Sequence, residues 1–79
     1  MNNELRQRSA KILSLALGRP VDPVSNPVRG ETPDWESLKH VEMVLMLEEE
    51  FRICLTEEEA GALQSLDQIV QAMRSQHGS

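Results

Sequence analysis

Apolar residues recur at helical spacing over four stretches of this sequence, and no stretch has the two-residue alternation typical of a strand. We predict helices over about residues 4–17, 35–51, 56–63 and 66–75. One stripe of the first predicted helix comprises Leu5, Ser9, Ile12, Leu13 and Ala16, and Gly18 then offers a stop. The pattern therefore predicts one all-α domain with four helices over residues 1–79.

A long connection separates the first two predicted helices. Residues 18–33 contain all four prolines and two of the four glycines, so they form a loop and not a regular element. We expect its three valines, Val21, Val24 and Val28, to pin the loop to the helices beneath.

The helix starts carry capping signals. Thr32 or Asp34 is a candidate N-cap for the second helix, with Asp34 and Glu36 in a favourable acidic first turn. Thr56 and Glu59 have the spacing of a capping box, in which each side chain satisfies a backbone amide of the other residue. The same device is expected again at Ser65–Gln68.

The second helix has apolar residues on two opposite faces. At about 100° per residue, one stripe comprises His40, Met43, Val44, Leu47 and Phe51. We expect this stripe to pack on the core. On the opposite side lie Leu38 and Leu45, with Val41 at their margin. The glutamates around them are Glu42, Glu48 and Glu49.

Two interpretations of this second face remain open. An apolar centre ringed by carboxylates suits a basic protein partner, since the centre supplies contact area and the acids steer the encounter. Alternatively, Leu38 and Leu45 are scattered surface leucines, which are common on soluble proteins.

The charge of the chain narrows its range of partners. The net charge is −5, which argues against nucleic acid because phosphate neutralisation requires clustered Lys and Arg. Residues 34–59 hold nine acids against Lys39 and Arg52, a net of −7, whereas residues 1–19 have a net of +3. An acidic centre suits a basic partner or simply maintains solubility.

Size and composition argue against an enzyme. A domain of 79 residues buries roughly 60% of the surface its unfolded chain exposes and has little room for a catalytic cavity. No apolar run approaches the roughly 20 residues of a membrane span, and the first residues lack the apolar core of a signal peptide. The single Cys54 cannot form an internal disulfide. We therefore expect a cytoplasmic protein, and we expect it to be a monomer. Cys54 is expected to be a small buried residue.

Two polar residues of the second helix are candidates for chemistry. Ser37 stands near the helix start, where free backbone amides suit a phosphate group, although serines there usually serve as caps. His40 could be a general base, but its place on the core stripe favours a partly buried residue that hydrogen-bonds locally. Ser37 and His40 do not form a hydrolytic pair, because no third group orients the histidine. No Cys or His has metal-ligand spacing.

The second helix also resembles a known family. Residues 34–51 read DWESLKHVEMVLMLEEEF. This run is similar to the acyl carrier proteins, whose hallmark is an Asp-Ser-Leu triplet followed by Val-Glu-Leu-Val and a helix ending Leu-Glu-Glu-Glu-Phe. Residues 53–73 resemble the family's short third helix and amphipathic fourth helix more loosely.

The resemblance implies a small four-helix bundle with a long first loop, and a carrier that is loaded covalently. A phosphopantetheinyl transferase would move a 4'-phosphopantetheine arm from coenzyme A to Ser37, and the arm's thiol would hold an acyl or aminoacyl group as a thioester. Enzymes that load and process the cargo would dock their basic patches on the second helix. Carried over position by position, the docking residues are Glu36, Leu38, Val41, Glu42, Leu45, Glu48 and Glu49.

The sequence departs from the family pattern at several positions. Glu36 replaces the usual Asp, Lys39 stands where fatty-acid carriers have an acid, and residues 28–33 lack the family's loop-closing aromatic and leucine. Trp35 and His40 match a subgroup with Trp before the triplet. These departures favour a specialised pathway, such as polyketide synthesis, lipid modification or amino-acid activation, over fatty-acid synthesis. They also leave open a non-covalent helical interaction module of the same fold without the arm.

Overall fold

A computed structural model describes residues 3–77 of the chain. Its elements are α1 (Asn3–Leu17), the 3-10 turn η1 (Arg29–Glu31), α2 (Ser37–Phe51), α3 (Glu57–Gly61) and α4 (Leu66–His77). Within this part of the chain there are four α-helices and no strand. The predicted fold class, a small all-α four-helix bundle with a long first loop, is confirmed.

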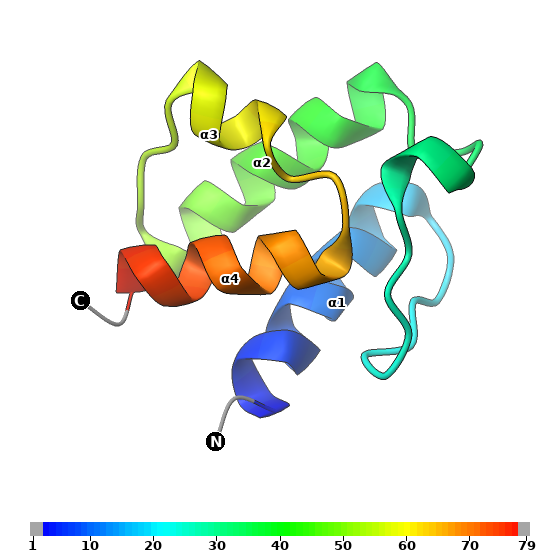
Figure 1. The fold of residues 1–79 in the computed structure, drawn as a ribbon, viewed down its shortest axis with the longest axis horizontal. Coiled ribbons are helices and arrows are strands. Elements are labelled where there is room, and N and C mark those ends of the chain that lie inside the picture. Colours follow the sequence, from blue (N-terminus) through cyan, green and yellow to red (C-terminus); the bar gives the residue numbers. More distant parts are fainter. Residues whose placement is uncertain (1–2, 78–79) are drawn as a thin grey trace.

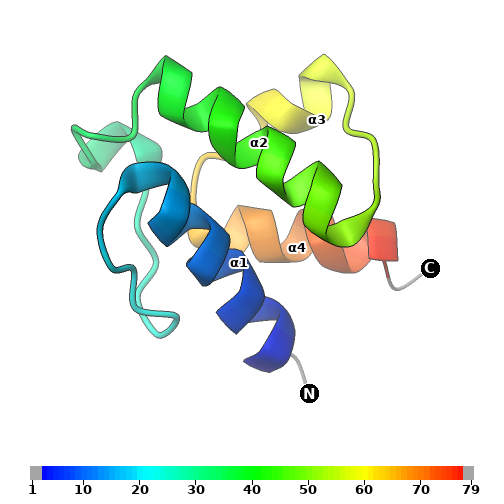
Figure 2. The same ribbon diagram turned by 180° about the vertical axis from the view of Figure 1, so that it is seen from behind.

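The two longest helices set the frame of the bundle. α1 packs against both α2 and α4, and the short α3 connects the far end of α2 back to α4 (Figures 1 and 2). The first loop, with η1, lies at the end of the molecule where α2 begins. This arrangement leaves one long side of α2 uncovered.

The predicted core stripes are buried as expected. In α1, Ser9, Ile12, Leu13 and Ala16 are buried, and Leu5 is half-buried. In α2, His40, Met43, Leu47 and Phe51 are buried, and Val44 is half-buried. α4 adds Leu66, Ile69, Val70 and Met73. Each large apolar side chain that is fully buried stabilises the fold by about 1.5–3 kcal/mol.

Arg6 holds the first half of the loop on the bundle. Its guanidinium donates hydrogen bonds to the backbone carbonyls of Pro23 and Ser25 and forms an ion pair with Asp67 of α4. The loop turns sharply between these contacts, because Asp22 accepts from the backbone N–H groups of Val24 and Ser25. This turn projects Val24 outward, 89% exposed. The prediction that Val24 pins the loop is therefore wrong, whereas Val21 packs against the core.

The second half of the loop is fastened to the start of α4. Val28 forms an isolated β-bridge with Ser65, and the backbone N–H of Arg29 donates to Gln64 O at 2.7 Å. The backbone N–H of Leu66 donates to Pro27 O at 3.1 Å. These backbone contacts fix η1 in place although it buries no residue of its own.

The start of α2 differs from the prediction. The helix begins at Ser37 and not near Trp35, and its N-cap is Glu36, whose side chain makes no capping hydrogen bond. Thr32 donates its hydroxyl to Val28 O, and Asp34 pairs with Arg19, so neither caps the helix. Consequently Asp34 and Glu36 lie before the first turn, which contains no acidic residue.

The other helix ends follow the sequence more closely. At α3, Thr56 and Glu59 form the predicted capping box. At α4 only half of the box forms, because Ser65 Oγ accepts from Gln68 N while Gln68 Oε1 accepts from Gln64 N. Gly18, at φ 78°, ends α1 as expected, since glycine adopts this left-handed conformation without steric cost.

Cys54 is exposed, which contradicts the prediction of a buried residue. It lies in the non-helical link between α2 and α3, between Ile53 and Leu55. Both of these neighbours pack against the core. Because successive side chains of an extended segment point to opposite sides, the intervening cysteine faces solvent.

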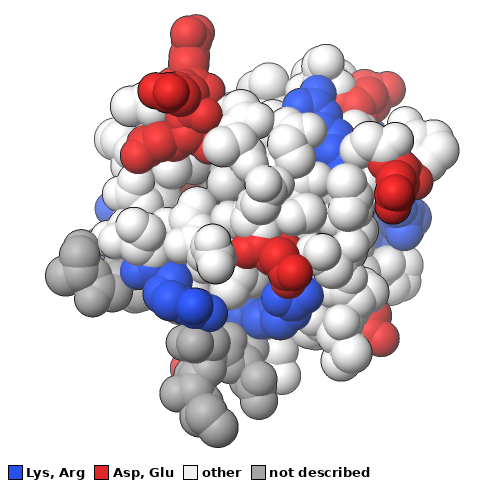
Figure 3. Space-filling model, in the orientation of Figure 1, with Lys and Arg blue, Asp and Glu red and all other residues white. Residues whose placement is uncertain are grey.

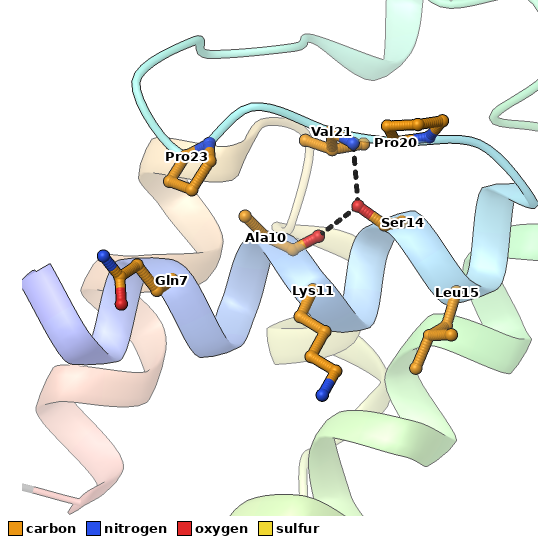
Figure 4. A pocket seen from close by; sticks show the side chains of 8 residues that line it. All are labelled: Gln7, Ala10, Lys11, Ser14, Leu15, Pro20, Val21 and Pro23. Atoms are coloured by element: carbon orange, nitrogen blue, oxygen red, sulfur yellow. Dashed lines mark hydrogen bonds between the residues drawn. The ribbon is translucent and has the colours of Figure 1, made fainter.

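A shallow pocket between α1 and the first loop is structural in character (Figure 4). The hydroxyl of Ser14, which lines the pocket, already has its hydrogen-bond partners. Its Oγ donates to Ala10 O and accepts from Val21 N, both at 2.8 Å. None of its lining residues belongs to α2. Across residues 3–77, no helix combines the length and the apolar character that crossing a membrane requires.

Candidate functional site

Ser37 is the first residue of α2, and its side chain is exposed. The first helical hydrogen bond of α2 runs from His40 N to Glu36 O. The backbone N–H groups of residues 37–39 therefore have no intrahelical acceptor. The terminal guanidinium nitrogen Nη2 of Arg29 lies 3.5 Å from Ser37 Oγ. The hydroxyl thus stands in solvent beside a cation and a helix N-terminus.

A buried hydrogen-bonded chain positions the segment that carries Ser37. Trp35 is 2% exposed, and its indole Nε1–H donates to His40 Nδ1 at 3.1 Å. With Nδ1 acting as the acceptor, His40 Nε2–H donates to Ala60 O in α3 at 2.8 Å. His40 is a buried, hydrogen-bonded helix residue as predicted, but the prediction that it hydrogen-bonds locally holds only for Trp35. Its second partner lies 20 positions along the chain, so the histidine joins the start of α2 to α3.

The uncovered side of α2 is apolar at its centre. Leu38, Val41 and Leu45 are 63%, 53% and 59% exposed. These residues, with the exposed acids Glu36, Glu42 and Glu49, form what we call the outer face of α2. The outer face begins directly beside Ser37, because Leu38 is the next residue of the helix.

Glu48 has a different environment from the other acids that the sequence grouped with it. It is half-buried, and its Oε2 accepts from the backbone N–H of Leu55 at 2.8 Å. This carboxylate therefore holds the link between α2 and α3 against the end of α2. Glu48 adds negative charge near the outer face, but its carboxylate already accepts the hydrogen bond from Leu55.

Charge is unevenly distributed over the molecule. Figure 3 shows acidic side chains gathered where α3 lies in Figure 1 and basic ones along the lower edge of the same view. The acids of α3 are Glu57, Glu58 and Glu59. In the loop before Ser37, the Arg19 guanidinium donates to Asp34 at 2.6 Å and holds the pKa of that carboxyl below its usual range.

Arg29 is the residue of this site that sequence reasoning missed. It lies eight positions before Ser37 in a proline-rich loop, and nothing in the spacing indicates that η1 turns its side chain toward the start of α2. The one available signal is its positive charge, since Arg29 is a cation that stands just before the acidic stretch beginning at Glu31.

Comparison with known proteins does not assign a function to this site. Comparison with protein-family models, with curated proteins and with solved structures finds no match to the chain. Within residues 3–77, no group of three or more His, Cys, Asp or Glu side chains could hold a metal ion. The site is therefore interpreted from its own residues.

Proposed function

We propose that this protein is a carrier that holds an acyl or aminoacyl group on a 4'-phosphopantetheine arm attached to Ser37. The observation that carries the proposal is the placement of Ser37. Its hydroxyl is exposed at the first position of α2 and adjoins an outer face that is both apolar and acidic. A carrier needs both features side by side, because each partner enzyme must dock on the protein and reach the attachment point.

The surroundings of Ser37 suit the phosphodiester that joins such an arm to a serine. Helix N-termini favour negative charge through their free N–H groups and the positive end of the helix dipole. Arg29 adds a guanidinium, which binds phosphate oxygens well. When bound, the arm would supply a thiol that carries the cargo as a thioester.

The outer face supports the partner side of the proposal. Its exposed leucines and valine supply apolar contact area. Unlike Glu50 and Asp67, Glu42 and Glu49 form no ion pair with another residue of the described part of the chain. Free carboxylates around an apolar centre steer a basic surface and set its orientation. The partners we propose are a phosphopantetheinyl transferase and cargo-loading and cargo-processing enzymes with basic patches.

The outer face also favours a second candidate. A helical module that binds a basic partner without any covalent arm would need Leu38, Val41 and Leu45 exposed, but it would have no use for the Ser37 hydroxyl. The two candidates differ in whether the Ser37 hydroxyl oxygen becomes covalently modified.

The mass of the intact protein after co-expression with a broad-range phosphopantetheinyl transferase separates them. A carrier gains one phosphopantetheine, and the Ser37→Ala variant gains none. A wild-type protein that stays unmodified under conditions in which a known carrier is fully converted favours the non-covalent module. Far-UV circular dichroism of Ser37→Ala controls for folding, since an exposed serine should be replaceable at little cost.

A further inference from the structure

We propose that Arg29 is a positioning residue that binds the phosphodiester formed on Ser37 and restricts the base of the arm. This inference rests on the proposed function and adds a residue outside α2 to the site. Its basis is the placement of one unpaired cation beside the hydroxyl that would receive the phosphate.

The fold presents Arg29 to Ser37 through a fixed piece of backbone. The backbone N–H of Arg29 donates to Gln64 O at 2.7 Å, and its neighbour Val28 forms the β-bridge with Ser65. The carbonyl of Arg29 accepts from Thr32 N at 3.2 Å, which closes the turn. Because η1 is fastened to the start of α4, the side chain of Arg29 extends from an anchored position.

Arg29 is also free to bind an anion. Among the described side chains, Arg6, Arg8 and Arg19 each form an ion pair with an acid. Arg29 forms none, although Glu31 lies two positions away on the same turn. The only side-chain hydrogen bond of Arg29 within residues 4–76 is the one to Ser37 Oγ, and at 3.5 Å it is at the limit of such a bond.

Attachment of the arm would turn this weak contact into a stronger one. In that step the bond between Ser37 Oγ and phosphorus forms as the pyrophosphate bond of coenzyme A breaks, adenosine 3',5'-bisphosphate leaves, and the hydroxyl proton passes to a base of the transferase. A phosphodiester places negatively charged oxygens next to Ser37 Oγ, and guanidinium–phosphate hydrogen bonds are roughly twice as strong as neutral ones. Lys39 is half-buried two positions beyond Ser37, and Glu36 is exposed one position before it. The positive charge of Arg29 would offset the repulsion that Glu36 exerts on the phosphate.

The test compares loaded and unloaded protein for wild type, Arg29→Gln, Arg29→Lys and the control Arg74→Gln. Arg74 is an exposed arginine on α4, so the control removes the same charge away from the site. At low salt, loading should raise the wild-type Tm by about 2–4 °C through this contact, as expected for a partly exposed charge pair in a domain of this size. Arg74→Gln should keep this gain, Arg29→Gln should lose it, and Arg29→Lys should retain part of it.

A second readout follows the phosphorus atom itself. The ³¹P resonance of the loaded protein should shift in Arg29→Gln and should coincide with that of wild type in Arg74→Gln. Equal Tm gains and equal ³¹P positions for Arg29→Gln and Arg74→Gln would overturn the role of Arg29 while leaving the carrier function intact. Failure of wild type to accept the arm would overturn both proposals.

Discussion

The two faces of α2 come from one helix but have opposite environments. The inner face presents Met43, Leu47 and Phe51, which are 1%, 0% and 5% exposed. The outer face presents Leu38, Val41 and Leu45, each more than half exposed. Both faces contain large apolar side chains, but only those of the inner face are packed in the core.

The difference separates residues that hold the fold from residues that are available to a partner. Burial stabilises a side chain by removing it from water, and the residues of the outer face gain little in this way. A cluster of exposed apolar residues next to acids is typical of an interaction surface. The following predictions test this division, beginning with the largest expected effect.

Phe51→Ala should destabilise the protein by about 3–5 kcal/mol, because it leaves a cavity where α2 meets α1. This approaches the whole stability expected of a small domain, so the variant should be largely unfolded at ambient temperature. Phe51 also packs under the Arg8 guanidinium, 4.5 Å from the ring centroid. The matched control is Leu45→Ala, which should stay within about 0.5 kcal/mol of wild type. Thermal melts that rank the two variants in the reverse order would contradict the division of α2 into two faces.

Trp35→Phe should cost about 1–3 kcal/mol, since it leaves the buried His40 Nδ1 without its donor. Urea denaturation at neutral pH measures the loss. Adding His40→Leu removes the unpaired acceptor, so the double variant should cost less than the sum of the two single variants. Strictly additive costs would show that the indole–imidazole hydrogen bond does not stabilise the segment before Ser37.

Glu49→Lys should slow transfer of the arm to Ser37 without unfolding the domain, because it reverses a charge on the outer face. The effect should shrink as salt rises, since screening acts over about 10 Å at 0.1 M ionic strength. Glu4→Lys, at the exposed start of α1, controls for net charge, and Lys39→Glu should speed transfer by a transferase that prefers an acidic helix. Identical rates for all of these variants at low salt would mean that the acids serve only solubility.

The smallest expected effect is at Asp34, where a pH titration tests the contact with Arg19. The pKa of Asp34 is lowered chiefly by the hydrogen bond from Arg19. A lowered pKa in the folded state favours folding above the ordinary value of about 3.9, and this contribution is lost as the pH falls through the lower, folded-state value. NMR titration of the Asp34 carboxyl carbon should give a midpoint below that ordinary value, and Arg19→Gln should raise it. A midpoint that does not respond to Arg19→Gln would contradict the assignment.

Helical periodicity predicted the four helices and both faces of α2, because burial of a stripe leaves a direct pattern in the sequence. The same pattern failed to predict where α2 begins, because the residues before Ser37 are not helical. The start of α2 was placed two residues early, since Trp35 is apolar and looked helical. In the structure its backbone N–H closes a turn on Thr32 O, and its side chain enters the core.

The site was predictable only within α2. The exposed outer-face residues follow from position along one helix, whereas the choice of Ser37 among the serines follows from the resemblance to the acyl carrier proteins. Arg29 reaches Ser37 because η1 is bridged to Gln64 and Ser65, some 35 residues away. Such long-range contacts have no local signature. The same holds for the hydrogen bond that the Leu55 backbone N–H donates to Glu48 and for the exposure of Cys54, which depend on how the chain turns after Arg52.

The central claim is that Ser37 is the attachment point of the arm, and mapping the modified peptide tests it most directly. The chain contains other serines, among them the exposed Ser25 and Ser75, which serve as internal controls. Wild-type protein treated with coenzyme A and a transferase should yield one modified peptide by tandem mass spectrometry, with the phosphopantetheine on Ser37. A modification at any other serine, or an unmodified Ser37 peptide after complete conversion of a control carrier, would contradict the account.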